Sequence, residues 1–117
     1  MSSGIVPEAN AWVCPALMNV TQEVIESIKK GSMGKANRHV HDGDEMYLIV
    51  GQENAATIAV TLGDDYYEIK TPGAVYIPAG VPHSIEMIDG EIGKFGGACP
   101  VYLGTEYITK PVPENWK

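Results

Sequence analysis

The stretch from Gly34 to Gly51 reads GKANRHVHDGDEMYLIVG and carries the strongest structural signal in the chain. It holds His39 and His41, two of only three histidines in the sequence. Side chains two residues apart point to opposite sides of a helix but to the same side of a strand, so this pair can bind one metal ion only on a strand. The turn-forming residues 42–44 follow, and Glu45 then opens an apolar run. A strand, a tight corner and a second strand would bring the Glu45 carboxylate back beside the two imidazoles.

The third histidine ends a second motif, PAGVPH at residues 78–83. Proline and glycine fix a turn there, and His83 begins the next apolar run. Imidazole nitrogens and a carboxylate oxygen suit a divalent first-row transition metal. The alternatives are surface histidines, a solvated turn carboxylate and a histidine that only holds its loop. The use of every histidine in the two motifs favours one metal site made of His39, His41, Glu45 and His83.

The two motifs together resemble those of the cupin superfamily. The first cupin motif is a glycine, a spacer, H-x-H, three or four residues, a glutamate, a spacer and a glycine, which matches Gly34–Gly51. The second is a glycine, a spacer and P-x-G-x2-H, which matches Gly73–His83. Three spacers are one residue shorter than in the family, and Met87 stands where an asparagine is common. The resemblance covers about residues 24–103 and implies a double-stranded β-helix, or jelly-roll barrel, with metal ligands at His39, His41, Glu45 and His83.

The composition fits a single all-β domain. The chain has 117 residues, of which 44% are hydrophobic and 20% charged, enough for one globular core. Its 13 glycines and 8 prolines exceed average usage and indicate many turns. We expect one domain over residues 1–117, with an N-terminal arm at 1–23, a barrel core at 24–103 and a C-terminal tail at 104–117.

Short apolar runs broken by turn residues predict several strands, at 46–50, 57–62, 66–70, 74–77, 84–88 and 91–103. Alternation over 57–62, followed by the turn at 63–65, predicts a β-hairpin. Asp89 and Gly90 are a strong hairpin signal and predict a second one. Residues 24–30 fit either a short helix or a strand, and their β-branched residues favour the strand.

The charge balance excludes some classes of partner. Eight basic against fifteen acidic residues give a net charge of −7, which disfavours general binding of nucleic acid or anionic membranes. No apolar stretch approaches the roughly 20 residues of a membrane span, and residues 1–13 do not resemble a signal peptide, so we expect a cytoplasmic protein. Cys14 and Cys99 form no disulfide framework and are expected to be two buried thiols.

Strand parity suggests what surrounds the metal. Lys35 shares the face of the first two histidines if the strand extends back, and Tyr47 shares the face of Glu45. Both are candidate catalytic residues, Tyr47 as a hydrogen-bond donor or an acid or base, and Lys35 as an anchor for a substrate carboxylate. The alternatives are a tyrosine at the barrel mouth and a solvated lysine.

Four protein ligands would leave one or two coordination sites open on the metal, so we expect a metal-dependent enzyme whose small substrate chelates there through vicinal oxygen atoms, as a hydroxy or keto acid would. A dioxygenase is the first expectation, and an isomerase, decarboxylase or lyase is the alternative. A sugar- or small-molecule-binding module with a structural metal also fits. One divalent ion of Fe, Mn, Ni or Zn is expected per chain. Exposed β edges need cover, and residues 9–20 are apolar enough to supply it, so we expect a homodimer.

Overall fold

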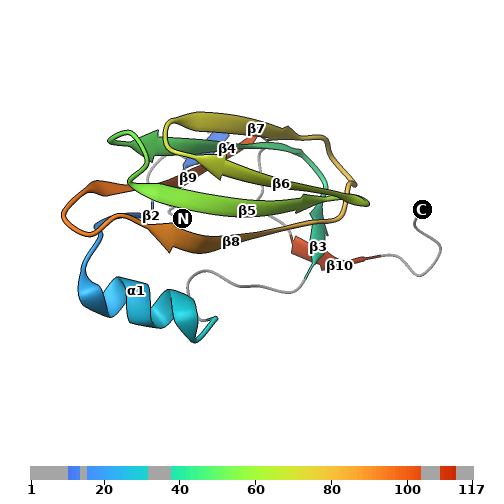
Figure 1. Ribbon diagram of the computed structural model, residues 1–117. Helices are drawn as coiled ribbons and strands as arrows, with labels where there is room; N and C mark the ends of the chain where they lie inside the picture. Colours follow the sequence, from blue (N-terminus) through green and yellow to red (C-terminus); the bar gives the residue numbers. More distant parts are fainter. Residues whose placement is uncertain (1–10, 14–15, 32–37, 104–108, 113–117) are drawn as a thin grey trace.

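Two five-stranded antiparallel sheets pack face to face in the computed structural model, which describes residues 11–13, 16–31, 38–103 and 109–112 (Figure 1). Sheet A consists of β1 (Ala11–Val13), β2 (Ala16–Asn19), β4 (Asp44–Gly51), β7 (Gly73–Ile77) and β9 (Phe95–Leu103). Sheet B consists of β3 (His39–His41), β5 (Ala56–Leu62), β6 (Asp65–Lys70), β8 (His83–Gly90) and β10 (Thr109–Pro111). The expectation of an all-β chain is confirmed.

From β2 to β9 the chain changes sheet at every connection except the one between β5 and β6. The strand order is β1-β9-β4-β7 in sheet A, where β2 also pairs with β9, and β10-β3-β8-β5-β6 in sheet B. No strand pair among the described residues joins the two sheets. The described strands therefore form two separate sheets and not the closed barrel that we expected. Consecutive edge strands β6 and β7 illustrate this, because each pairs inside its own sheet.

The hairpin over residues 57–70 is confirmed, because β5 pairs with β6 throughout its length. The hairpin predicted at Asp89 and Gly90 is wrong. Both residues continue β8, which pairs with β5 in sheet B, while β9 pairs with β4 in sheet A. The turn after β8 therefore takes the chain from sheet B to sheet A. The turn residues alone do not distinguish such a crossing from a hairpin within one sheet.

The strand favoured at residues 24–30 is also wrong, because Gln22–Lys29 form the helix α1. Thr21 caps its N-terminus by accepting a hydrogen bond from the Val24 N–H. The apolar residues Val24, Ile25 and Ile28 follow the helical period and pack on the core. This packing outweighs the strand preference of their β-branched side chains. Figure 1 shows α1 outside the sandwich, next to β8.

The core fills the space between the sheets and reflects the period of two along each strand. On β4, Glu45, Tyr47 and Ile49 are buried, while their neighbours are half-buried or exposed. From sheet B the core receives Ile58, Val60 and Met87. The packing of the two sheets thus brings the first half of β4, in sheet A, close to the start of β8, in sheet B.

The segments expected to be an arm and a tail contribute strands. Strands β1 and β2 pair with β9 of the same chain, and β10 pairs with β3. Within the described ranges, no helix is both long and apolar enough to cross a membrane.

Candidate metal centre

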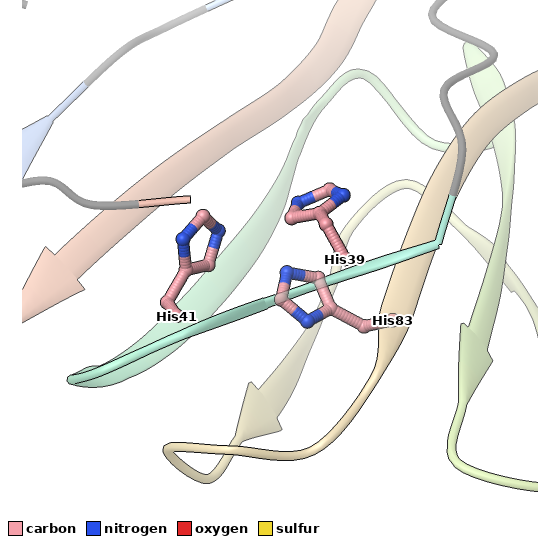
Figure 2. A group of neighbouring side chains, drawn as sticks. All are labelled: His39, His41 and His83. Atoms are coloured by element: carbon pink, nitrogen blue, oxygen red, sulfur yellow. The ribbon is translucent and has the colours of Figure 1, made fainter. Parts of the chain in front are cut away.

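Strand β3 presents His39 and His41 on one face, as the sequence predicted. Across the ladder, His39 stands directly opposite His83, the first residue of β8. The ring centroids lie 4.4 Å apart for His39 and His83 and 4.9 Å apart for His41 and His83. Figure 2 shows the three rings gathered over β3. One ring nitrogen from each lies within 4.8 Å of the others, so the cluster could hold a metal ion.

The corner between β3 and β4 brings Glu45 to these rings from the opposite sheet. Its Oε1 atom lies 3.1 Å from Nε2 of His83 and 3.4 Å from Nε2 of His41. Gly43 makes the tight corner possible, because a Cβ there would clash with the carbonyl oxygen of Leu103 and lie 2.9 Å from the Tyr102 hydroxyl. The Glu45 carboxylate therefore lies beside the imidazoles, as the sequence predicted.

The loop before β8 orients His83. The Nδ1 atom of His83 lies 3.0 Å from the carbonyl oxygen of Val81, which can only accept. Nδ1 therefore carries the proton in the neutral ring, and Nε2 presents a lone pair, the tautomer that a metal ligand needs. The loop is itself fastened to the first motif, because Gly80 N–H donates to the carbonyl of His41 and Ala79 N–H donates to Asp44.

The neighbouring imidazoles keep Glu45 ionised. Burial alone would raise the pKa of this carboxyl group, but its polar contacts with His41 and His83, and the positive charge of their protonated rings, lower it from 4.5 to about 2. Glu45, His41 and His83 are nearly inaccessible to solvent, whereas His39 is partly exposed. The cluster therefore combines a buried negative charge with an access side at His39.

The observed distances suit a cation between Glu45 and His83. In the neutral ring with Nδ1 protonated, His83 Nε2 presents a lone pair to Glu45 Oε1, whereas a protonated ring forms an ion pair with that oxygen. Two lone pairs at 3.1 Å repel unless a proton or a metal ion lies between them. Two ligands bonded to one ion at about 2.1 Å lie about 3 Å apart at a right angle and about 3.4 Å apart in a tetrahedron. The residues present therefore fit the expected metal.

A cavity of about 200 Å³ is lined by residues of both sheets, and none of the four candidate ligands is among them. It is lined by strands β2 and β9 of sheet A and β5 and β8 of sheet B. Ile85 contributes from the position two residues after His83, and Pro100 from the position opposite Tyr47. The other lining residues are Ala16, Met18, Ile58, Glu86, Met87, Gly97 and Ala98. Apart from Glu86 the lining side chains are apolar, which is typical of a small-molecule pocket.

The two candidate catalytic residues have different outcomes. Tyr47 is buried on the inner face of β4, with its ring centroid 6.1 Å from that of His83. It therefore lies inside the sandwich beside the cluster and not at an exposed mouth. Lys35 lies outside the described residues.

Tyr102 is a neighbour of the cluster that sequence analysis missed. It is buried, pairs with Glu45 across the ladder between β4 and β9, and packs edge-on against the His41 ring at 5.4 Å. The largely apolar run at residues 99–103 fits a strand, but only the register of β9 on β4 places this side chain beside the ligands.

Comparisons with known proteins give limited information. No family model and no curated protein matches this chain. A conserved protein of unknown function from Streptococcus pyogenes is 23% identical, with a TM-score of 0.49 over 63% of this chain and 58% of the other. The polyketide cyclase RemF from Streptomyces resistomycificus is 18% identical, with a TM-score of 0.48 over 68% of this chain and 52% of the other. This chain thus spans little more than half of either structure, and neither likeness carries an argument about function.

Proposed function

We propose that this chain is a metal-dependent enzyme of the cupin type that acts on a small oxygenated molecule, with dioxygenation as the first candidate reaction. The observation that carries the proposal is the gathering of three imidazoles and a buried carboxylate, with Glu45 Oε1 lying 3.1 Å from Nε2 of His83 and 3.4 Å from Nε2 of His41. The strand order adds support for the jelly-roll assignment. Strands alternate between two sheets and reverse at the β5–β6 hairpin, as in a chain folded back on itself and wound into two layers.

The proposed ligands of one divalent Fe, Mn, Ni or Zn ion are His39, His41, Glu45 and His83. The three histidines come from sheet B and the carboxylate from sheet A, so both sheets hold the ion. A bound metal would supply Lewis-acid chemistry, or reaction with dioxygen if it is iron. A carboxylate whose pKa is about 2 offers its full negative charge to the cation at neutral pH.

The apolar cavity supports a substrate with two unlike parts. An oxygenated head group, such as a hydroxy or keto acid, would reach the ligand cluster. A hydrocarbon part would fill the space beyond Ile85 and Pro100. Such surroundings exclude water and also admit dioxygen, which is itself apolar. This is the feature that favours dioxygenation over reactions that need several proton-transfer groups around the substrate.

Two further residues have proposed roles in this scheme. Tyr47 would donate a proton or hydrogen bond to the bound substrate from the wall between the ligands and the core. Tyr102 would hold the His41 ring in its ligating orientation through the edge-on contact. Lys35 stays a candidate anchor for a substrate carboxylate.

Metal analysis by plasma mass spectrometry, on protein purified without chelators, tests the ligand set. We expect about one ion per chain in the wild type, loss of the ion in His83→Ala, and retention in Ser84→Ala, the matched neighbour on the other face of β8. Oxygen uptake is then measured over a panel of hydroxy and keto acids with hydrocarbon chains. An absence of bound metal after reconstitution with each ion would overturn the proposal.

The same panel separates the alternatives. Substrate consumption without oxygen uptake would replace dioxygenation by isomerisation, decarboxylation or elimination. Thermal stabilisation by a panel compound, with no turnover by the metal-loaded protein, would instead make the chain a binding module with a structural metal.

A further inference from the structure

The outer face of sheet A is apolar, whereas a sheet face in contact with water usually carries polar side chains. On β4 the inward residues are buried, but the outward residues Met46, Leu48 and Val50 are also apolar and half-buried. The register places Cys99 and Val101 of β9 beside them, and Tyr76 of β7 on the other side. A strand that is apolar on both sides is typical of a sheet covered on both faces.

The outer face of sheet B provides an internal control. There the register groups mostly polar side chains from three strands: Thr57, Ala59 and Thr61 of β5, Tyr66, Glu68 and Lys70 of β6, and Ser84 and Glu86 of β8. This is the regular alternation of a sheet with one wet face. The two outer faces of the same sandwich therefore differ in polarity, because the face of sheet B carries charged side chains on two strands.

Charge restricts what could cover it. Strands β4, β7 and β9 contain no lysine or arginine, and their only carboxylates are Asp44 and Glu45. Glu45 points inward to the ligand cluster. Asp44 is occupied at the end of the face, where it accepts hydrogen bonds from the Tyr76 hydroxyl and the Ala79 N–H. A nucleic acid or a charged peptide would find no opposite charge on this face, whereas a second uncharged apolar face would match it.

We propose that the outer face of sheet A is the interface between two copies of this chain, packed face to face about a twofold axis. A second copy matches for two reasons. The chain carries a net charge of −7, so two copies repel each other except where they meet through an uncharged surface. Such an isologous contact also needs only a patch that is complementary to itself.

The size of the face is adequate. The eight residues of β4 span about 27 Å, and four strands at about 4.8 Å spacing give a width of about 19 Å. The projected area is thus on the order of 500 Å², and the relief of the side chains raises the accessible area toward the roughly 800 Å² per partner of a stable complex. This arrangement replaces strand exchange as the basis of the homodimer, since β1 and β2 pair within their own chain.

Sedimentation equilibrium of the full chain at about 100 µM tests the interface, because a micromolar dimer is largely assembled there. We expect a mass of twice 12.6 kDa for the wild type. Leu48→Glu places an unpaired charge at the centre of the face and should raise the dissociation constant by about 100-fold or more. The matched variant Thr61→Glu, on the outer face of sheet B, should stay dimeric. A monomeric wild type, or a Leu48→Glu variant that dimerises like the wild type, would overturn the proposal.

A second measurement does not depend on the folding of Leu48→Glu. In the full chain with Cys14→Ser, Cys99 is half-buried beside Leu48, and a maleimide reports its accessibility. The rate of modification should fall about tenfold as the protein is concentrated through the dimer transition. A rate that does not change with concentration would contradict a buried Cys99. Neither measurement involves the metal, so failure here leaves the proposed enzyme function untouched.

Discussion

The backbone N–H of Gly80 donates to the carbonyl oxygen of His41 over 2.9 Å, which joins the loop before β8 to the end of β3. The same loop holds the His83 ring through the carbonyl of Val81. The positions of two proposed ligands are therefore coupled through the backbone, before any metal binds. A site arranged in advance in this way loses less conformational entropy when the ion binds.

The corner at Gly43 gives the first prediction. In Gly43→Ala the new Cβ would clash with the carbonyl of Leu103, and this backbone cannot move aside easily. We expect a loss of about 2 kcal/mol or more in the free energy of unfolding, and a loss of metal affinity, because the corner positions Glu45. Gly93→Ala is the control, since its alanine meets open space and carries the cost of positive φ, which Gly43→Ala does not. Equal effects on metal affinity in both variants would contradict a specific role of the corner.

Metal binding should stabilise the fold. A free ion at about 100 times its dissociation constant adds about 2.7 kcal/mol to the free energy of unfolding, which raises Tm by about 10 °C in a domain of this size. Calorimetry of the chelator-treated protein, with and without each ion, measures the shift. Glu45→Gln removes the charge but keeps the shape, so its shift should be much smaller. An equal shift in that variant would exclude Glu45 as a ligand.

The pH dependence of metal affinity should follow the histidines and not Glu45. The pKa of Glu45 is lowered from 4.5 to about 2, so its carboxylate stays ionised until the pH falls through that range. An imidazole must be neutral to bind a metal. Affinity should therefore fall as the pH is lowered through the range in which the histidine ligands gain protons, before Glu45 does. Isothermal titration at a series of pH values measures this, and a fall that began only near pH 4.5 would contradict it.

Tyr47→Phe tests the proposed donor. The ring contact with His83 and the packing of the core are kept, so metal content should change little. Turnover of the substrate found by the panel should fall by about 100-fold, with KM changed far less, if the hydroxyl acts on the bound substrate. Unchanged turnover would show that Tyr47 lines the site but that its hydroxyl does not act on the substrate.

Thr71 gives a stability prediction away from the metal. Its buried hydroxyl donates to the carbonyl of Gln52 over 2.6 Å and accepts from the N–H groups of Ala55 and Ala56. Thr71→Val keeps the shape and removes these bonds, so the free energy of unfolding should fall by about 2–4 kcal/mol, measured by urea denaturation. Metal content should stay at the wild-type level. Loss of the metal in a folded Thr71→Val variant would show that the two ends of the sandwich are linked.

The ligand cluster was more predictable from the sequence than the fold around it. Histidines two apart, a turn of two residues and the PAGVPH loop are local features, and local geometry brings their side chains together. The helix α1 was missed because Val24, Ile25 and Ile28 favour strands in isolation, and their packing against the core decides otherwise. Tyr102 and the failed hairpin at Gly90 share another cause, since both depend on which distant strand lies alongside.

The alternation of successive strands between the two sheets has a consequence for how the chain folds. The central strand β4 pairs along its whole length with β9, and the four strands β5 to β8 separate the two in the sequence. Few contacts can therefore form early between residues close in sequence, and folding should be slow, in the millisecond-to-second range of non-local β topologies. During synthesis, the chain that has emerged as far as β8 would expose one apolar edge of β4. Such an intermediate is prone to aggregation, and assistance by a chaperone would matter most at that stage.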